Sequence, residues 1–440
     1  MLDLSIVGFA TIFIILFLMM RKYTTALVAL TLVPCIACIA VGQVDKLPGF
    51  ITSGIGKIAS TGIMFIFSVS FFGIMSAVGA FDAFITRIIK FTKGDPLKVM
   101  LGTWAFTIVA HLDGSGISTI LLVVPVMLPI VERLHINKNY FCLVMGITMG
   151  IMNAVPWGGP TLRAATVLEM DVMQLWAPII PTQIFGLLIV VGFAIYFGKK
   201  EKARLVNEGL LIEGGGFNFA DFTPQLTEEQ LQYRRPKLLL VNWILIVLVL
   251  GMMVASILSP LASFMLGVVI ALLVNFRDPK VQGQMVDEHG KNAIMLSTII
   301  FAAGVLMGVM SGTGMSKAMA STLVNMIPVS MSPYIAPIIG FCNLPLTLMF
   351  DADSYYFAIM PIIAQTVQAF GIPAVDVARA SIIGQMTTCL VISPMVATFF
   401  LFVGMNKLDM GEWQKFAMKY YFFMTTVMTI FMIITGVFSL

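Results

Sequence analysis

The sequence predicts an all-α polytopic membrane protein, built from two inverted repeats of five transmembrane helices that each contain a re-entrant hairpin and a broken helix. Three observations lead to this prediction. Hydrophobic residues make up 59% of the 440 residues and charged residues only 11%, whereas a soluble domain has about a quarter of its residues charged. Apolar stretches reach the ~20 residues that a helix needs to cross a bilayer. The breaks between these stretches recur at a constant spacing along the chain.

The first repeat is predicted to occupy residues 1–198. Its hairpin has two apolar limbs, Leu97–Ala110 and Gly116–Ile130, each shorter than a comfortable full span. An amphipathic stretch at Phe81–Lys93 precedes the hairpin. The five predicted spans are Leu4–Met20, Tyr23–Val41, Ser60–Ala80, Tyr140–Val155 and Trp176–Phe197.

The second repeat is predicted to occupy residues 237–440 and has the same order of segments. A short arm at Gly312–Met326 precedes its hairpin, whose limbs are Pro333–Leu344 and Tyr355–Gln368. Residues 199–236 between the repeats are polar with basic residues at both ends, which predicts a cytoplasmic linker. The five predicted spans of this repeat are Lys237–Leu258, Ala262–Asn275, Asn292–Met310, Val377–Leu401 and Tyr420–Val437.

Two pairs of landmarks keep the same distance in the sequence. The interval from Asp113 to Asp351 is equal to the interval from Pro156 to Pro394. A constant offset between independent landmarks indicates a duplicated unit. Because five spans is an odd number, the second copy is expected to be inserted upside down.

The distribution of Lys and Arg supports this orientation. With the N-terminus outside, the segments that face the cytoplasm hold most of the basic residues, among them those at positions 199–204, as the positive-inside rule expects. The predicted location is therefore the cytoplasmic (inner) membrane, crossed many times. Inverted repeats that place broken helices at mid-membrane are typical of secondary transporters. The small net charge of +4 argues against a nucleic-acid partner.

The first hairpin breaks at residues 111–115, which read HLDGS. Irregular backbone at membrane depth is tolerated where it is buried in protein or lines a cavity. The amide groups that begin the second limb favour an anion, and Ser115, Ser118 and Thr119 add hydroxyl groups. The alternative is an ordinary loop between two full spans, with Asp113 in water.

The second hairpin breaks at the matching place, around Asp351, Asp353 and Ser354. Two carboxylates near mid-membrane are costly to hold without a cation, a proton or a network of donors. The alternative is that both aspartates lie at the surface, where they would need no partner.

The span after the first hairpin is interrupted by residues 156–160, which read PWGGP. Proline and glycine end a half-helix there and free backbone groups for a ligand. Arg163 follows the break, and a guanidinium can fork onto a carboxylate with two parallel hydrogen bonds. The alternative is an interfacial arginine at the outer face. The second repeat has a weaker counterpart of this break at Ser393 and Pro394.

These breaks supply the candidate site residues. The substrate-binding candidates are Ser115, Gly116, Ser118, Thr119, Asn153, Gly158, Gly159, Pro160, Thr161, Arg163, Ser354, Thr387 and Ser393. The candidates for coupling or for a cation are His111, Asp113, Asp351 and Asp353, with the three aspartates as candidate metal ligands. No catalytic residue and no resident cofactor are predicted. His135 and His289 are expected in cytoplasmic loops without a function.

Three motifs at these positions resemble the citrate–metal:proton symporters, the CitMHS family of the wider ion-transporter superfamily. They are HLDGSG at 111–116, GGPTLRA at 158–164 and DADSYYF at 351–357, and the likeness covers nearly the whole chain. Sodium-coupled relatives in the superfamily carry Ser-Asn-Thr at the hairpin tips. Neither Gly116–Thr119 nor Asp351–Ser354 spells that motif, and this departure counts against sodium coupling.

The resemblance implies proton-coupled symport of citrate complexed with a divalent cation of the Mg²⁺ or Ca²⁺ type, which travels with the substrate. It also implies a homodimer with a fixed scaffold domain and a moving transport domain, an elevator mechanism. One alternative is a sodium- or proton-coupled transporter of another di- or tricarboxylate or of a sugar acid. An alternative of another class is a membrane-embedded enzyme, but the chain has no HExxH zinc motif, no nucleophile elbow and no Walker phosphate loop.

Overall fold

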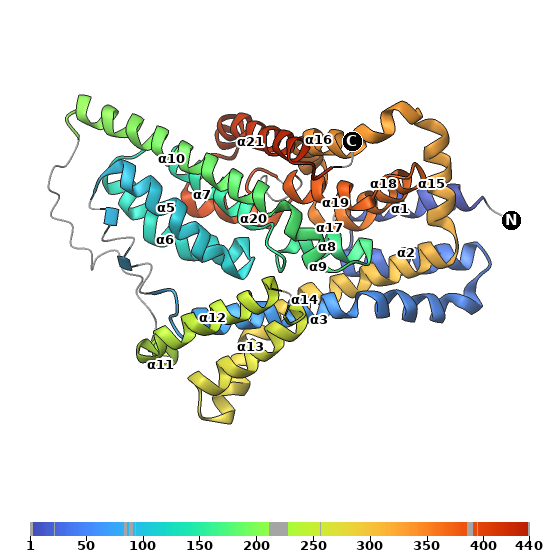
Figure 1. Ribbon diagram of the computed structural model, residues 1–440, viewed down its shortest axis with the longest axis horizontal. Helices are drawn as coiled ribbons and strands as arrows, with labels where there is room; N and C mark the ends of the chain where they lie inside the picture. Colours follow the sequence, from blue (N-terminus) through green and yellow to red (C-terminus); the bar gives the residue numbers. More distant parts are fainter. Residues whose placement is uncertain are drawn as a thin grey trace.

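The computed structural model describes residues 3–21, 23–82, 86–87, 91–92, 94–210, 228–255, 257–384, 390–393 and 395–438. Throughout these residues the regular secondary structure is helical, as the sequence predicts (Figure 1). The order of helices, hairpins and breaks along the chain also follows the predicted order. The amphipathic stretch predicted at Phe81–Lys93 lies largely outside the described residues.

The chain begins with three helices. Asp3 caps the first by accepting from the amide of Ser5, and Thr25 caps the second by accepting from the amide of Val28. The third begins well before the predicted span at Ser60, because its Gly- and Ser-rich first half continues the helix despite lower hydropathy. The bounds are α1 Leu4–Met20, α2 Ala26–Ala40, η1 Val44–Lys46 and α3 Leu47–Ala77.

The first hairpin and the helices after it follow. The break predicted between the two limbs is present as a short 3-10 turn, and the break predicted in the next span separates two helices. The bounds are α5 Pro96–Ala110, η2 His111–Asp113, α6 Gly116–Arg133, α7 Lys138–Met152, α8 Gly159–Leu168, α9 Val172–Trp176, η3 Ala177–Ile179 and α10 Ile180–Asn207. The second limb, α6, is longer than predicted, and α10 continues into the predicted linker.

The second half contains the remaining helices. Its hairpin includes one turn of π-helix directly after Ser354. The bounds are α11 Glu228–Tyr233, η5 Pro236–Leu238, α12 Leu239–Val254, α13 Pro260–Asn275, α14 Pro279–Gly312, α15 Met315–Met326, η6 Val329–Tyr334, α16 Ile335–Met349, α17 Ala352–Ser354, η7 Tyr355–Ile359, α18 Met360–Ala369, α19 Ala374–Ile383, α20 Ala397–Asn406 and α21 Met410–Ile434.

Among the described residues, five helical stretches are long and apolar enough to cross a membrane, and six if a bent pair counts as one span. The bent pair is the end of α14 with α15, which meet at 71°. Other predicted spans appear as shorter apolar helices, including α1, α2 and α13. The five stretches are Val44–Ala77, Gly116–Arg133, Val172–Asn207, Pro236–Val254 and Met410–Ile434.

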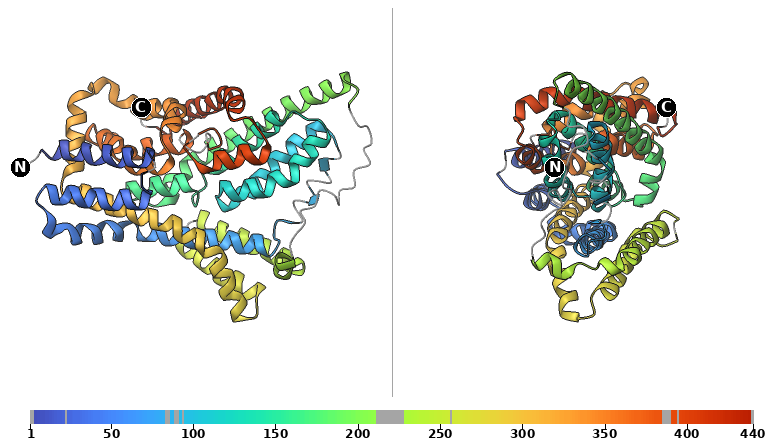
Figure 2. Two further views of the ribbon diagram at one scale, coloured as in Figure 1. Left: turned by 180° about the vertical axis from the view of Figure 1, so that it is seen from behind. Right: turned by 90° about the vertical axis from the view of Figure 1, so that its left-hand side faces the viewer.

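The two longest single helices, α3 and α14, lie side by side and form what we call the long pair (Figures 1 and 2). Glycines allow the close approach. A Cβ atom on Gly54 would lie 2.1 Å from the carbonyl oxygen of Gly304, and one on Gly308 would lie 2.2 Å from that of Phe50. Helix α13 packs on α3, and α12 packs on α13, on the side away from the hairpins. The long pair therefore lies between these two helices and most of the rest of the molecule.

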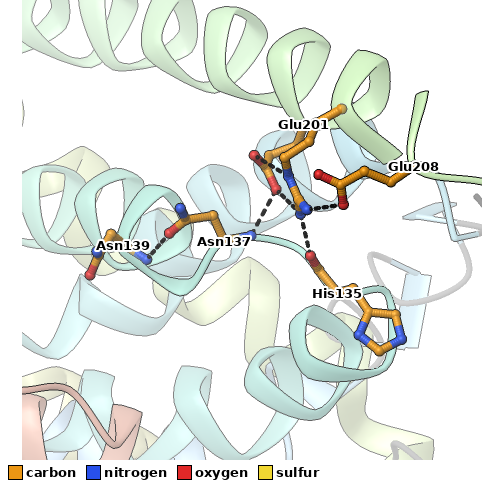
Figure 3. A network of polar contacts seen from close by, with 6 residues as sticks. His135, Asn137, Asn139, Glu201 and Glu208 are labelled. Atoms are coloured by element: carbon orange, nitrogen blue, oxygen red, sulfur yellow. Dashed lines mark hydrogen bonds and ion pairs between the residues drawn. The ribbon is translucent and has the colours of Figure 1, made fainter. Parts of the chain in front are cut away.

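The hairpins and broken helices gather on the other side of the long pair (Figure 1). There α5 packs against α6, α7 and α10, and α16 packs against α19 and α21. A buried glutamate fixes the end of α10 to the turn between α6 and α7 (Figure 3). Glu201 accepts from the amide of Asn137 at 2.8 Å and pairs with Arg204, which donates to the carbonyl oxygen of His135 at 2.6 Å. His135 itself has a positive φ and lies in this turn, as expected for a loop.

Candidate functional site

A cavity of about 550 Å³ lies between the long pair and the two hairpins. The first hairpin contributes residues 113–118, and the break between α7 and α8 contributes Asn153, Gly159 and Arg163. The second hairpin contributes residues 351–353. Segments far apart in the sequence are therefore brought together as the duplicated breaks predict.

The tip of the first hairpin is held by its own side chains. Gly114 has a φ of 69°, in the left-handed region that favours glycine, and this turns the chain between the limbs. Asp113 accepts from the amide of Ser115 at 2.8 Å, and Ser115 caps α6 by accepting from the amide of Ser118 at 3.3 Å. Residues 115–118 line the cavity, so the first turn of α6 faces it with its N-terminal end.

The break between α7 and α8 docks directly on this tip. The indole of Trp157 donates to the carbonyl oxygen of Leu112 at 2.6 Å and stacks on Phe72 of α3. Asn153 ends α7, and only a glycine fits at position 158, since a Cβ atom there would lie 2.2 Å from the carbonyl oxygen of Asn153. The break is therefore a tightly packed junction rather than an open loop.

Arg163 belongs to the first half of the chain and forms an ion pair at the cavity wall with a residue of the second half. Its Nε donates to Oδ1 of Asp353 at 2.7 Å, and both side chains are about four-fifths buried, with 17% and 20% of their surface exposed. A buried pair of this kind costs free energy to desolvate, and removing one partner leaves an uncompensated charge. Arg163 is thus an interior residue of the site and not an isolated arginine at the outer face.

Asp351, the other aspartate of the second hairpin, also accepts a hydrogen bond from the protein. Asp351 caps α17 by accepting from the amide of Ser354 at 2.7 Å. The π-helical turn that follows buries Tyr355 and Tyr356, whose hydroxyl groups both contact Ser381 of α19. The second hairpin tip is therefore anchored to the broken helix that follows it in the chain.

His111 lies behind the first hairpin tip, fully buried. Its Nδ1 is 2.7 Å from the hydroxyl of Thr119, which also donates to the carbonyl oxygen of Ser115 at 2.8 Å. The ring also lies near the side chain of Asn153, and its Nε2 has no hydrogen-bond partner among the described residues. This histidine joins the two limbs of the hairpin and does not itself line the cavity.

The structure divides the predicted site residues into three groups. Those that line the cavity are Asp113, Ser115, Gly116, Ser118, Asn153, Gly159, Pro160, Arg163, Asp351 and Asp353. Those that lie behind its wall are His111, Thr119, Gly158, Thr161, Ser354 and Ser393. Thr387 lies outside the described residues.

The hydroxyl groups behind the wall contact backbone carbonyl oxygens or another side chain. Thr161 donates to the carbonyl oxygen of Ala154 at 3.0 Å, and Ser393 donates to that of Thr347 at 2.6 Å. The hydroxyl of Ser354 lies 3.8 Å from the sulfur of Met19. In this structure, these three residues shape the site without facing the cavity.

The cavity also has residues that sequence reasoning missed. Glu288 and His289 of α14 line it, as do Phe65, Val69 and Gly73 of α3. The expectation that His289 lies in a loop was wrong, because α14 begins at Pro279, well before the span predicted to start at Asn292. The polar composition of residues 279–292 hid this helical extension, although its capping by Asp278 and the proline at its start are ordinary signals of a helix N-terminus.

The charged side chains that line the cavity are mostly acidic. In the described part of the chain they are Asp113, Arg163, Glu288, Asp351 and Asp353, four carboxylates against one guanidinium. The same described residues contain no group of three or more His, Cys, Asp or Glu side chains that could hold a metal ion. The three candidate aspartates therefore share a cavity without forming a ready-made metal site.

Comparison with known proteins places this fold and sequence among transporters. The sequence profile of the citrate transporter family, CitMHS, matches residues 12–384. The chain is 36% identical to a citrate transporter of Bacillus subtilis, over 99% of this chain and 100% of that protein. It is 35% identical to a Mg²⁺/citrate complex secondary transporter of the same organism, over 99% of both chains.

A solved structure shares the architecture. The YdaH transporter of Alcanivorax borkumensis matches with a TM-score of 0.59 at 11% identity, over 90% of this chain and 88% of that one. The family is one of secondary transporters, so the chain is a multi-pass membrane protein and not an enzyme. Since the family profile and both relatives cover most of its length, this chain belongs to the citrate transporter family, CitMHS.

Proposed function

We propose that this protein carries citrate, complexed with a divalent cation, into the cell together with protons across the cytoplasmic membrane. The observation that supports this cargo most directly is the charge of the cavity, where four carboxylates face one guanidinium. Citrate carries about three negative charges at neutral pH, and such a wall repels it. A bound Mg²⁺ or Ca²⁺ removes two of those charges, and protons on the wall remove more repulsion.

The division of labour within the cavity follows from the residue types. The first-turn amides of α6 and the hydroxyls of Ser115 and Ser118 offer donors to carboxylate oxygens. The guanidinium of Arg163 offers two parallel donors, and Asp353 fixes its position through Nε. Asp113 and Asp351 remain to meet the cation or a proton.

The divalent cation enters as part of the cargo and needs few ligands from the protein. Citrate itself supplies several oxygen ligands, and Mg²⁺ in particular keeps water in its coordination sphere. A site of this kind needs only one or two protein carboxylates near the complex. This agrees with the absence of a three-residue metal group among the described residues.

We further propose that the molecule works as an elevator and as a homodimer. The long pair, with α12 and α13 outside it, would form the fixed scaffold. The hairpins with their broken helices would move past it. The cavity lies along the surface between these two parts, which is where a sliding motion would carry a ligand.

The deciding experiment is uptake of labelled citrate by proteoliposomes that contain the purified protein. Uptake is measured without divalent cation and with Mg²⁺, Ca²⁺ or Mn²⁺ in turn, each with and without an imposed pH gradient. We expect accumulation that requires a divalent cation and a gradient acidic outside. Liposomes without protein and gradients collapsed by a protonophore are the controls. Accumulation that follows a sodium gradient, or that is full in the presence of a chelator, would contradict the proposal.

A further inference from the structure

His289 is the imidazole that lines the cavity, and nothing in the hairpin design accounts for it. It lies with Glu288 on α14 of the long pair, whereas the predicted site residues that line the cavity lie on the hairpins and the broken helix. Residues Ile299 and Ile300 of the same helix line the cavity beside the hairpins. His289 is about three helical turns earlier in the helix than Ile300, which is about 16 Å along the helix axis.

The cavity therefore extends along the long pair away from the hairpin tips. On α3 it continues from Phe65 to Gly73, near the end of that helix, and on α14 from Ile300 back to His289. The backbone amide of Arg235, from the end of the predicted cytoplasmic linker, donates to the carbonyl oxygen of Val78 just beyond this end of α3. By the predicted orientation, the extension leads to the cytoplasm.

At the opposite end of the molecule, an exposed ion pair lies beside the same helices. Lys57 lies about four helical turns before Gly73 on α3. It pairs with Glu169 at the end of α8, with 2.9 Å between Nζ and Oε1. Trp157 also packs on Phe72 and Phe264, between the hairpin tip and the outer two helices. The cavity thus reaches His289, next to the exposed Glu288, near the cytoplasmic end of the long pair in the predicted orientation.

The ring of His289 is held in a fixed place. A Cβ atom on Gly73 would lie 2.6 Å from its Nδ1, so the absence of a side chain at Gly73 makes room for the ring. Its Nε2 is shielded from solvent and makes no hydrogen bond within the described residues. A shielded imidazole nitrogen without a partner is unfavourable, and a ligand that supplies a partner would remove that cost.

We propose that His289 forms an exit subsite on the long pair, where its ring nitrogen binds a carboxylate of the metal–citrate complex as the complex leaves the hairpins for the cytoplasm. Glu288 lines the cavity next to it, so a bare polyanion is repelled there and a complex that carries a divalent cation is tolerated. This inference rests on the proposed function. The subsite acts only when the carrier is open to the cytoplasm, because a group on the fixed helices contacts the ligand in only one state of the carrier.

The test uses two substitutions of His289 and one control. His289→Phe keeps a planar ring against Gly73 and removes both nitrogens. His289→Gln places an amide N–H near the position of Nε2. The matched control is His135→Asn, which changes a histidine of the turn after α6, where φ is 53° and asparagine is tolerated.

Citrate exchange with Mg²⁺ is measured in right-side-out and inside-out membrane vesicles from cells that express each variant. We expect His289→Phe to raise the half-saturating citrate concentration about tenfold at the cytoplasmic face, from the loss of one hydrogen bond to a charged group. The external face should keep the wild-type value, which also shows that the variant is folded. His289→Gln should restore most of the cytoplasmic affinity, and His135→Asn should match wild type.

An unchanged cytoplasmic value in His289→Phe would overturn the inference, and so would an equal change at both faces or a failure of Gln to rescue. These results differ from a failure of the proposed function, in which wild-type vesicles would exchange no citrate with any divalent cation.

Discussion

At the scale of single residues, the ion pair between Arg163 and Asp353 connects the two halves of the chain inside the cavity. The sequence predicted that both residues belong to the site, because each follows a break in an apolar segment. It could not predict that they pair with each other, since residues 190 positions apart meet only through the packing of α8 against the second hairpin. It also placed Ser354 and Ser393 in the substrate site, where packing instead turned both hydroxyls away from the cavity.

The first prediction concerns Arg163. Arg163→Lys keeps the positive charge but loses the fork and the Nε bond to Asp353, so the half-saturating citrate concentration should rise about tenfold or more. The measurement is initial uptake against citrate concentration in proteoliposomes with Mg²⁺. Arg277→Lys, at an exposed position before α14, is the matched control and should behave as wild type. Wild-type affinity in Arg163→Lys would show that the guanidinium does not touch the cargo.

The second prediction concerns the aspartates that line the cavity. In single Asn variants of Asp113, Asp351 and Asp353, at least one should lose accumulation driven by a pH gradient and keep exchange of internal for external citrate. Exchange needs no net movement of protons, whereas accumulation does. Both activities are measured side by side on the same vesicles. Asp113 and Asp351 also accept backbone hydrogen bonds, which asparagine can still accept, so a purely structural role predicts only modest loss. Full pH-driven accumulation in all three would place coupling elsewhere.

At the scale of elements, the sequence predicted helix identity well and helix length less well. Positions of the two hairpins and of the first broken helix followed from proline, glycine and charged residues, which interrupt apolar runs, whereas Pro394 of the second predicted break lies outside the described residues. Both helices of the long pair are longer than predicted. Hydropathy indicates how well a segment is accommodated in lipid and not whether it forms a helix. Both helices have a proline near the start and pack against each other, and Asp278 caps the start of α14. His289 was misplaced for this reason.

The third prediction concerns the glycines of the long pair. Gly54→Ala should destabilise the protein by about 1–3 kcal/mol, since its methyl group would collide with the carbonyl oxygen of Gly304. Gly56→Ala is a matched control on the same helix, where the new Cβ would contact no other helix, and it should be neutral or slightly stabilising. The measurement is the apparent melting temperature in detergent, read by loss of the monodisperse elution peak. Equal melting temperatures for the two variants would contradict the close packing of α3 on α14.

At the scale of the whole molecule, the cavity needs both halves of the chain. Residues 113–163 supply one hairpin tip and the broken helix, and residues 288–353 supply the other tip and half of the long pair. The sequence predicted this from the constant offset between the paired landmarks and the odd number of spans. It could not predict which faces of α3 and α14 meet the hairpins, because these faces are apolar like those that meet lipid.

The fourth prediction follows from this division. Residues 1–210 and 228–440, expressed as two polypeptides in the same cell, should assemble and restore citrate uptake, since α3 with α14 and Arg163 with Asp353 hold the halves together. Each polypeptide expressed alone should give no uptake, because each supplies only part of the cavity. Uptake is measured in whole cells, and co-purification through a tag on one half checks assembly. Transport by either half alone would contradict the shared cavity.

The acidic cavity has a consequence for the chemistry of the medium in which such a cell lives. If the wall admits citrate only with its cation, the rate of uptake follows the concentration of the one-to-one complex and not that of total citrate. Adding citrate beyond the available metal then does not increase the rate of uptake. A stronger chelator lowers the uptake of citrate without binding to the carrier. Growth on citrate would be limited by the hardness of the water as much as by the nutrient itself.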